Sequence, residues 1–228
     1  MRVINHCENL VITPCIREFT ALVGLTMCHS STATWTSDAI LSDTNHLKLR
    51  ALTFADATMA NAWTTSVNAN DMPRALVMLD LCGGGSSANG GWENLDSIAA
   101  FWLGLTYLYL ESIGLIDVSA SVTTTLQLDE LSLRGNAIQS VPPALLENNE
   151  LIYPITEIPG FQHLSSSGSN LSGLQLLSME STRLEKLPSW VNGILSVNGA
   201  VVYAGSSPCD CWGRRFCVVG CNHVHDAS

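Results

Sequence analysis

The chain has 228 residues, 46% of them hydrophobic, and a formal net charge of −10 at pH 7 with only ten lysine and arginine residues. This length and apolar content can bury a sizeable core within one domain. The shortage of positive charge argues against nucleic acid, whose phosphates attract basic surfaces, and it disfavours anionic membranes as partners.

The first residues, 1–8, contain neither an apolar segment nor a small-residue cleavage site, so they do not form a secretory signal. The chain is therefore either intracellular or a fragment, and we favour a fragment because repeat-like sequence begins almost at once. A longer protein would place it outside the cell or at the cell surface, whereas a full product would be cytoplasmic. The richest apolar stretch, Ile98–Leu110, is too short to span a bilayer, so we expect no direct membrane insertion.

A Leu-x-x-Leu-x-Leu template recurs along the chain, with conservative replacements. Its first positions are Leu22, Leu49, Leu76, Leu105, Leu128, Leu174 and Val197. The first three intervals between these positions are 27, 27 and 29 residues long. The later intervals are 23, 46 and 23 residues long, and 46 is two units of 23. One structural unit for about every 23 residues is the mark of a stacked repeat protein, or solenoid.

Each template predicts a short strand, because alternate strand residues point to opposite faces and the leucines then share one face. A unit this short cannot bury its apolar face alone. Neighbouring units therefore stack in parallel about 4.8 Å apart and share a continuous core.

The unit that matches the template most fully runs from Leu128 to Pro142, with Asn136 at its turn. An inward asparagine side chain can satisfy turn amides that the tight bend leaves unpaired. We expect this role for Asn136.

The regular spacing fails between the units at Leu128 and Leu174. A unit is expected near Leu151, but the sequence there does not match, and the template reappears ten residues late at Phe161. Either a loop is inserted before Phe161 and the connection after it is shortened, or the gene model is imperfect at this place. The glycine-rich run at 83–87 predicts a solvent loop.

Four of the eight cysteines lie in the last twenty residues and predict a disulfide-bonded cap over the end of the core. They are Cys209, Cys211, Cys217 and Cys221. Zinc binding with His223 and His225 is an alternative, although the Cys-x-Cys spacing is tighter than usual, and free thiols are a third.

The other four cysteines lie in the first half of the chain. Cys7 and Cys15 are candidates for an N-terminal disulfide. Cys28 and Cys82 occupy the same template position, but the unit containing Ala55 separates them, and two strand spacings of about 10 Å exceed disulfide reach. We therefore expect thiols at these two positions.

Several segments resemble the leucine-rich repeat proteins, most closely the extracellular type found in plant-pathogenic oomycetes. These segments are Leu105–Val118, Leu131–Pro142, Glu157–Leu164, Leu174–Trp190 and Val202–Cys209. The resemblance implies an α/β horseshoe, with a parallel sheet on the concave face and loops, 3-10 turns or short helices on the convex face. It also implies protein or peptide recognition. We divide the chain into a solenoid at 1–208, irregular at 1–104, regular at 105–205 and disrupted at about 143–173, and a cysteine-rich end at 209–228.

If the chain recognises a partner, the outward strand residues form the contact surface. They are Asp80, Tyr107, Tyr109, Glu111, Glu130, Ser132, Arg134, Leu176, Ser178 and Glu180. Tyr107 and Tyr109 are the strongest candidates, because strand tyrosines offer large contact area at small entropic cost, although ordinary solvent-facing tyrosines fit equally well. Register places Glu111 beside Arg134, where a surface ion pair would contribute little.

Searches for nucleophile-elbow, metalloprotease, P-loop and dinucleotide-binding motifs find none. We therefore expect no catalysis, no metal and no cofactor. The favoured function is a module that binds a protein or peptide on its concave face. The alternatives are a structural ectodomain segment of a larger receptor-like protein and a truncated product without binding activity.

Overall fold

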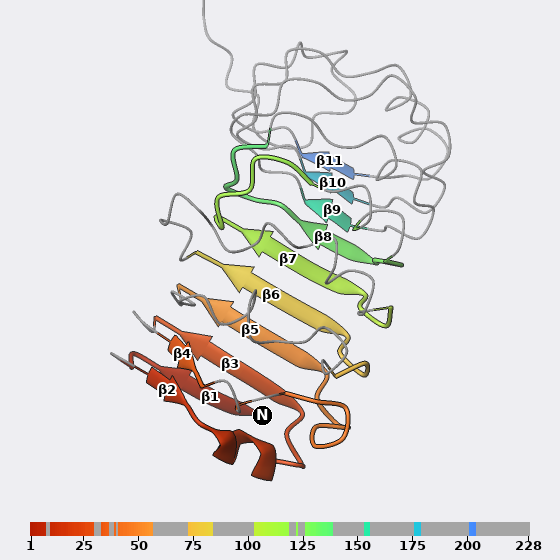
Figure 1. Cartoon of the computed structure of the whole chain (residues 1–228). Helices are drawn as coiled ribbons and strands as arrows, with labels where there is room; N and C mark the ends of the chain where they lie inside the picture. Colours follow the sequence, from red (N-terminus) through yellow and green to blue (C-terminus); the bar gives the residue numbers. More distant parts are fainter. Residues whose placement is uncertain are drawn as a thin grey trace, which may run out of the picture.

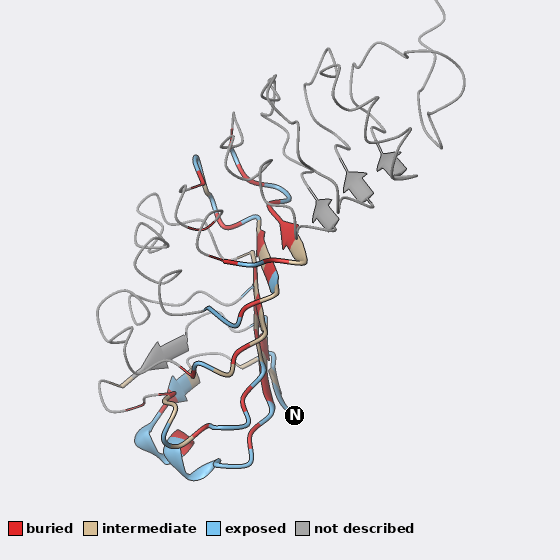
Figure 2. Cartoon of the chain, turned by 90° about the vertical axis from the view of Figure 1, so that its right-hand side faces the viewer, coloured by how far each residue is buried: buried red, intermediate tan, exposed pale blue. Residues whose placement is uncertain are grey.

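The main feature of the fold is one parallel sheet that runs the length of the chain. The computed structural model describes residues 1–7, 10–29, 36, 39, 41–56, 73–83, 103–118, 122 and 126–138, and the backbone of strands at 33–35, 153–155, 176–178 and 201–203. Within these residues, nine strands form a sheet in which each strand pairs with that of the next repeat (Figure 1). The stack curves, with the sheet on its inner, concave side (Figure 2). The predicted parallel concave sheet is confirmed.

The nine strands of this main sheet are β1 (Arg2–Asn5), β3 (Gly24–Cys28), β5 (Ala51–Ala55), β6 (Met78–Cys82), β7 (Tyr107–Glu111), β8 (Glu130–Ser132), β9 (Tyr153–Ile155), β10 (Leu176–Ser178) and β11 (Val201–Tyr203). Two further strands, β2 (Leu10–Ile12) and β4 (Ala33–Trp35), pair in parallel as a small second sheet set back from the main one (Figure 2). A 3-10 helix, η1 (Pro14–Glu18), follows β2.

The core consists of three columns of apolar side chains, one for each leucine of the template. The register pairs Leu25, Leu52, Leu79, Leu108 and Leu131 directly from strand to strand. The columns on either side are Leu22, Leu49, Leu76, Leu105 and Leu128, and Met27, Phe54, Leu81, Leu110 and Leu133. None of these side chains is more than 6% exposed. Each buried leucine contributes about 1.5–3 kcal/mol, so the columns supply the main driving force for stacking.

The repeat unit expected near Leu151, which the sequence template did not match, has its strand 23 residues after the preceding one. Strand β9 pairs Pro154 with Leu131 of β8, which makes Pro154 the equivalent of the second leucine. The predicted shift of this strand to Phe161 is therefore wrong. Proline lacks a backbone N–H and is uncommon inside strands, which is why the template did not reveal the unit. The connections on either side lie outside the described residues.

Two other sequence assignments also need correction. The register pairs Leu177 of β10 with Val202, so the last repeat begins two residues after the predicted Val197. Strand β1 forms an additional repeat unit before Leu22, with Arg2 paired to Leu25. The template missed β1 because its residues, Arg2–Asn5, carry no leucine.

A left-handed backbone residue follows each main-sheet strand from β1 to β8. The series is His6, His29, Asp56, Gly83, Ser112 and Gly135, with φ between 48° and 72°. The amide of each of the first five donates to a carbonyl of the next repeat, as from His29 to Ala55 at 2.8 Å. A β-carbon at Gly83 would collide with the carboxylate of Asp56. Glycine is therefore favoured there by both backbone conformation and space, although histidine, aspartate and serine adopt the same conformation in the equivalent turns.

The predicted role of Asn136 is confirmed. Its side chain is buried, and its Oδ1 accepts hydrogen bonds from the amides of Ile113 and Leu115, both at 3.1 Å. Its Nδ2 donates to the carbonyls of Leu110 and Leu133. One side chain thus satisfies buried backbone groups of two successive repeats, which would otherwise cost free energy inside the core.

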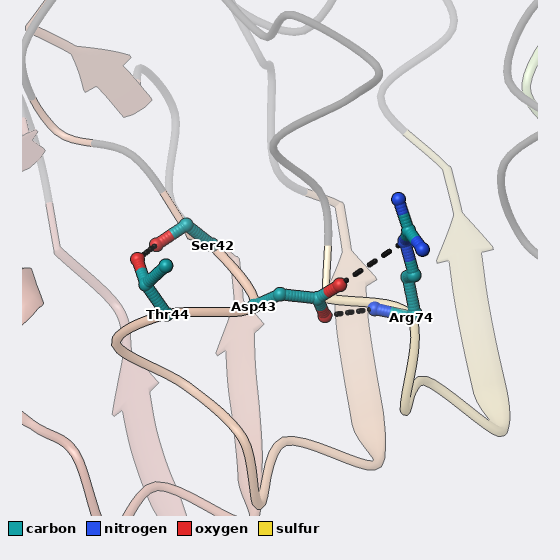
Figure 3. A network of polar contacts seen from close by, with 4 residues as sticks. All are labelled: Ser42, Asp43, Thr44 and Arg74. Carbon is teal, nitrogen blue, oxygen red and sulfur yellow. Dashed lines mark hydrogen bonds and ion pairs between the residues drawn. The ribbon is translucent and has the colours of Figure 1, made fainter.

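Polar contacts also join successive turns at the amino ends of the strands. Asp43, before β5, forms an ion pair of 3.3 Å with Arg74, before β6, and also accepts a hydrogen bond from the Arg74 amide (Figure 3). Nearby, Ser42 and Thr44 share a hydroxyl hydrogen bond of 2.9 Å. The Arg74 side chain is 81% exposed, so this ion pair contributes little beyond fixing the turn.

His46 is a buried structural histidine in the same turn region. Its Nδ1 accepts the amide N–H of Ser42 at 3.2 Å, so Nε2 carries the proton and donates to the carbonyl of Ile16 at 2.9 Å. This contact ties the turn before β5 to helix η1 of the first repeat.

The predicted N-terminal disulfide is not formed, because Cys7 and Cys15 are both free thiols. Strand β2 (Leu10–Ile12) separates the two residues along the chain, and Cys15 belongs to η1. The four C-terminal cysteines, with His223 and His225, lie outside the described residues. Of the helices that the structure describes, none has the length and apolarity needed to cross a membrane.

Candidate functional site

The concave face carries three outward columns of side chains, offset by one residue from the core columns. The first column is Gly24, Ala51, Met78, Tyr107 and Glu130. The second is Val3, Thr26, Thr53, Asp80, Tyr109 and Ser132. The third is Asn5, Cys28, Ala55, Cys82 and Glu111. The register places Asp80, Tyr107, Tyr109, Glu111 and Glu130 on β6–β8, and their role as contact residues stays a prediction.

The chemistry of this face changes sharply between β5 and β6. Strands β3 and β5 present only small or neutral side chains outward, including Gly24, Thr26, Ala51 and Thr53. Strands β6–β8 present carboxylates and aromatic rings. We call the five residues Asp80, Tyr107, Tyr109, Glu111 and Glu130 the acidic-aromatic patch.

The two tyrosines of the patch differ in accessibility. Tyr107 is 37% exposed, which makes it the more accessible ring, whereas Tyr109 is half-buried. The hydroxyl of Tyr109 is hydrogen-bonded to Glu130. Burial raises the pKa of Tyr109 far above its ordinary value, and the bond to Glu130 and the nearby charges of Glu130 and Asp80 raise it further. Tyr109 therefore stays neutral, and it holds the Glu130 carboxylate in place.

Ser132, which sequence analysis assigned to the contact surface, holds the Glu111 side chain in place. Ser132 belongs to the second column, but its side chain is fully buried, and its hydroxyl donates a hydrogen bond to Glu111. Because its side chain is fully buried, Ser132 does not form part of the accessible contact surface to which the sequence assigned it. Arg134 is exposed after β8 and lies close enough to lower the pKa of the Cys82 thiol.

Asp80 carries the most perturbed carboxylate of the patch. Burial, followed by the negative charge of Glu111, raises its pKa from 3.8 to about 6. Within the described part of the chain, no hydrogen bond or ion pair compensates this carboxylate. The patch therefore concentrates negative charge that is only partly satisfied by the protein itself.

Cys82 lies beside this charge in the third column. Burial raises the pKa of its thiol, and the carboxylates of Glu111, Asp80 and Asp56 raise it further. A raised pKa keeps the sulfur protonated and poorly nucleophilic. Cys82 is a free thiol, with Ala55 between it and Cys28 in the register. The expectation that these two cysteines do not pair is confirmed.

The remaining predicted contact residues lie near the C-terminal end of the sheet. Leu176 and Ser178 are in β10, which pairs with both β9 and β11. The side chains of these two residues and the whole of Glu180 lie outside the described residues. They stay predictions.

Sequence analysis missed a row of polar side chains beyond the carboxyl ends of the first strands. The rings of His6 and His29 stack with their centroids 4.9 Å apart, and His29 Nδ1 lies 3.2 Å from an Asp56 carboxylate oxygen. All three residues occupy the left-handed turn position, so the strand register would have revealed the row. In the described portion, no group of three histidine, cysteine or acidic residues is arranged to hold a metal ion.

Comparison with known proteins identifies the fold. The leucine-rich repeat domain of the type III effector XopL superposes with a TM-score of 0.59 at 14% identity, covering 90% of this chain and 75% of that one. The chain folds as a leucine-rich repeat solenoid. An internalin from Listeria monocytogenes gives a TM-score of 0.52 at 14% identity, covering 86% of this chain and 58% of the internalin.

At this identity the similarity establishes the leucine-rich repeat fold alone. No family model matches the chain, and no curated protein matches it. The narrower resemblance to oomycete proteins receives no support from these comparisons.

Proposed function

We propose that this leucine-rich repeat solenoid is a non-catalytic recognition module that binds a protein or peptide through the acidic-aromatic patch. The observation that carries the proposal is the exposed ring of Tyr107 directly opposite Glu130 and diagonal to Asp80, on adjacent strands of one sheet. Aromatic residues at the centre of a binding surface commonly contribute most of the binding energy.

Two carboxylates of the patch are held by neighbouring hydroxyls before any partner arrives. The backbone of the patch is held in the ladder of the sheet, Tyr109 anchors Glu130, and Ser132 anchors Glu111. A partner therefore loses less free energy to ordering these side chains than it would on a flexible loop. This preorganisation favours recognition over the alternative of a purely structural segment.

The test compares proteins captured from an extract of the source organism by three immobilised forms of the chain. The first is the wild type, and the second carries Tyr107→Ala with Glu130→Ala. The third carries Leu103→Ala with Ile116→Ala, which truncates two side chains that are 66% and 78% exposed but lie outside the patch. Circular dichroism confirms that all three are folded.

We expect one or more proteins to be retained by the wild type and by the Leu103/Ile116 variant, but lost with the Tyr107/Glu130 variant. Retention of the same proteins by all three forms would contradict recognition through the patch. Such a result would favour the structural role.

A further inference from the structure

The acidic-aromatic patch has a charge imbalance that specifies the chemistry of its occupant. Asp80, Glu111 and Glu130 lie on three successive strands, and Arg134 is the basic residue of the described concave face beside them. The hydrogen bonds of Glu111 and Glu130 come from the neutral hydroxyls of Ser132 and Tyr109, so they orient these carboxylates without neutralising them. An approaching positive charge would therefore gain from all three acids.

The rest of the concave face can accommodate a chain that continues from the patch. On β3 and β5 the outward side chains are glycine, alanine, threonine and the Cys28 thiol, which leave the sheet surface shallow. An extended segment can lie close to this surface while one of its side chains reaches the carboxylates on β6–β8. The face thus combines a smooth region with a charged anchoring region.

We propose that the occupant of the concave face is an extended protein segment that places an arginine side chain between Asp80 and Glu130 and against the ring of Tyr107, which lies on the strand between these two acids. This inference rests on the proposed function and adds the chemical class of the partner. Two observations support it: the negative charge of the patch complements a positively charged side chain, and the exposed ring of Tyr107 lies beside the acids.

Arginine fits this surface better than lysine does. Its planar guanidinium can bridge two carboxylates through several N–H groups and can stack on an aromatic face at the same time. A lysine ammonium is a compact charge that would be attracted to the acids but would not stack flat on Tyr107. A divalent cation is a weaker candidate, because the described acids do not form a group that could hold a metal ion.

The probe is a fluorescent peptide of alternating arginine and serine, compared with peptides of alternating lysine and serine and of alternating glutamate and serine. Binding is measured by fluorescence anisotropy at low and at physiological salt. The patch variant carries Asp80→Asn with Glu130→Gln. The matched control carries Glu18→Gln with Asp117→Asn, which makes the same change in net charge at two exposed residues outside the patch.

We expect the arginine peptide to bind about threefold or more tightly than the lysine peptide, and the glutamate peptide not to bind. The patch variant should weaken binding of the arginine peptide about tenfold, and the control variant less than about twofold. Tyr107→Ala should remove the preference for arginine over lysine while keeping part of the binding to both.

Several results would overturn the inference. Equal weakening by the patch and control variants would show that only net charge attracts the peptide, and absence of binding at low salt would exclude a basic occupant. Equal affinity for arginine and lysine peptides would remove the assignment to arginine. If any of these occurs while protein capture still requires Tyr107 and Glu130, recognition through the patch stands and only the partner's chemistry is wrong.

Discussion

Replacement of Asn136 by alanine tests how the turns of this solenoid are held together. The substitution removes the acceptor for the buried amide of Ile113 and the part-buried amide of Leu115, which would then be left without a partner. Each buried, unsatisfied amide costs about 1–3 kcal/mol, so we expect Asn136→Ala to lower the free energy of unfolding by about 3–5 kcal/mol. This is a large part of the roughly 5–15 kcal/mol typical of folded domains.

The measurement is urea unfolding followed by circular dichroism and tryptophan fluorescence. Asn5→Ala is the matched control, because it removes an exposed asparagine from β1 and should cost less than about 0.5 kcal/mol. Asn136→Asp provides a second arm, since it keeps the acceptor but turns a carboxylate toward the carbonyls of Leu110 and Leu133. We expect it to be destabilising at neutral pH and less so in acid. A loss below about 1 kcal/mol for Asn136→Ala would refute the assigned role.

Three further substitutions probe the core, the acidic-aromatic patch and the left-handed turn that follows β6. Leu79 is fully buried, so Leu79→Ala should lower the free energy of unfolding by about 2–5 kcal/mol in urea titrations; a near-neutral effect would exclude its column from the core. The pKa of Asp80, about 6 in the folded chain and 3.8 ordinarily, means that the folded state holds the proton more tightly than the unfolded state does. Ionisation of this residue therefore costs stability increasingly from about pH 4 to above pH 6. After allowance for solvent screening, Asp80→Asn should stabilise the chain by about 1–2 kcal/mol at pH 7 and have no effect below pH 4; equal effects at both pH values would contradict the raised pKa. Gly83→Ala should cost about 1–2 kcal/mol because of the left-handed backbone and the Asp56 carboxylate. The loss caused by Gly83→Ala should be smaller when residue 56 is already alanine, and an unchanged loss in the Asp56→Ala background would show that the collision does not matter.

Periodicity in the sequence was sufficient to predict the parallel sheet, the core leucines and the turn asparagine. Each of these depends on a side chain that must be apolar, or must be an amide, at a fixed position in the repeat. Asn136 was recognisable for the same reason, because its unit matches the template at every neighbouring position. The columns on the concave face then follow from the register alone.

What the sequence did not reveal depends on contacts between repeats. Strand β9 was missed because Pro154 replaces a leucine, although the ladder on either side still positions it. Ser132 donates a hydrogen bond to the Glu111 side chain of the preceding strand, a contact that its own unit does not contain. The row formed by His6, His29 and Asp56 arises from a backbone conformation that no local motif specifies. These features become visible only when neighbouring repeats are placed side by side.

The most direct test of recognition through the concave face is hydroxyl-radical footprinting of the chain with and without a protein that it captures. We predict that Tyr107 and Met78, on the concave face, become protected in the complex. Leu103 and Ile116, which are exposed outside the patch, should be modified to the same extent in both states. Protection of Leu103 and Ile116 with unchanged modification of Tyr107 would place the binding surface elsewhere and contradict the proposed function.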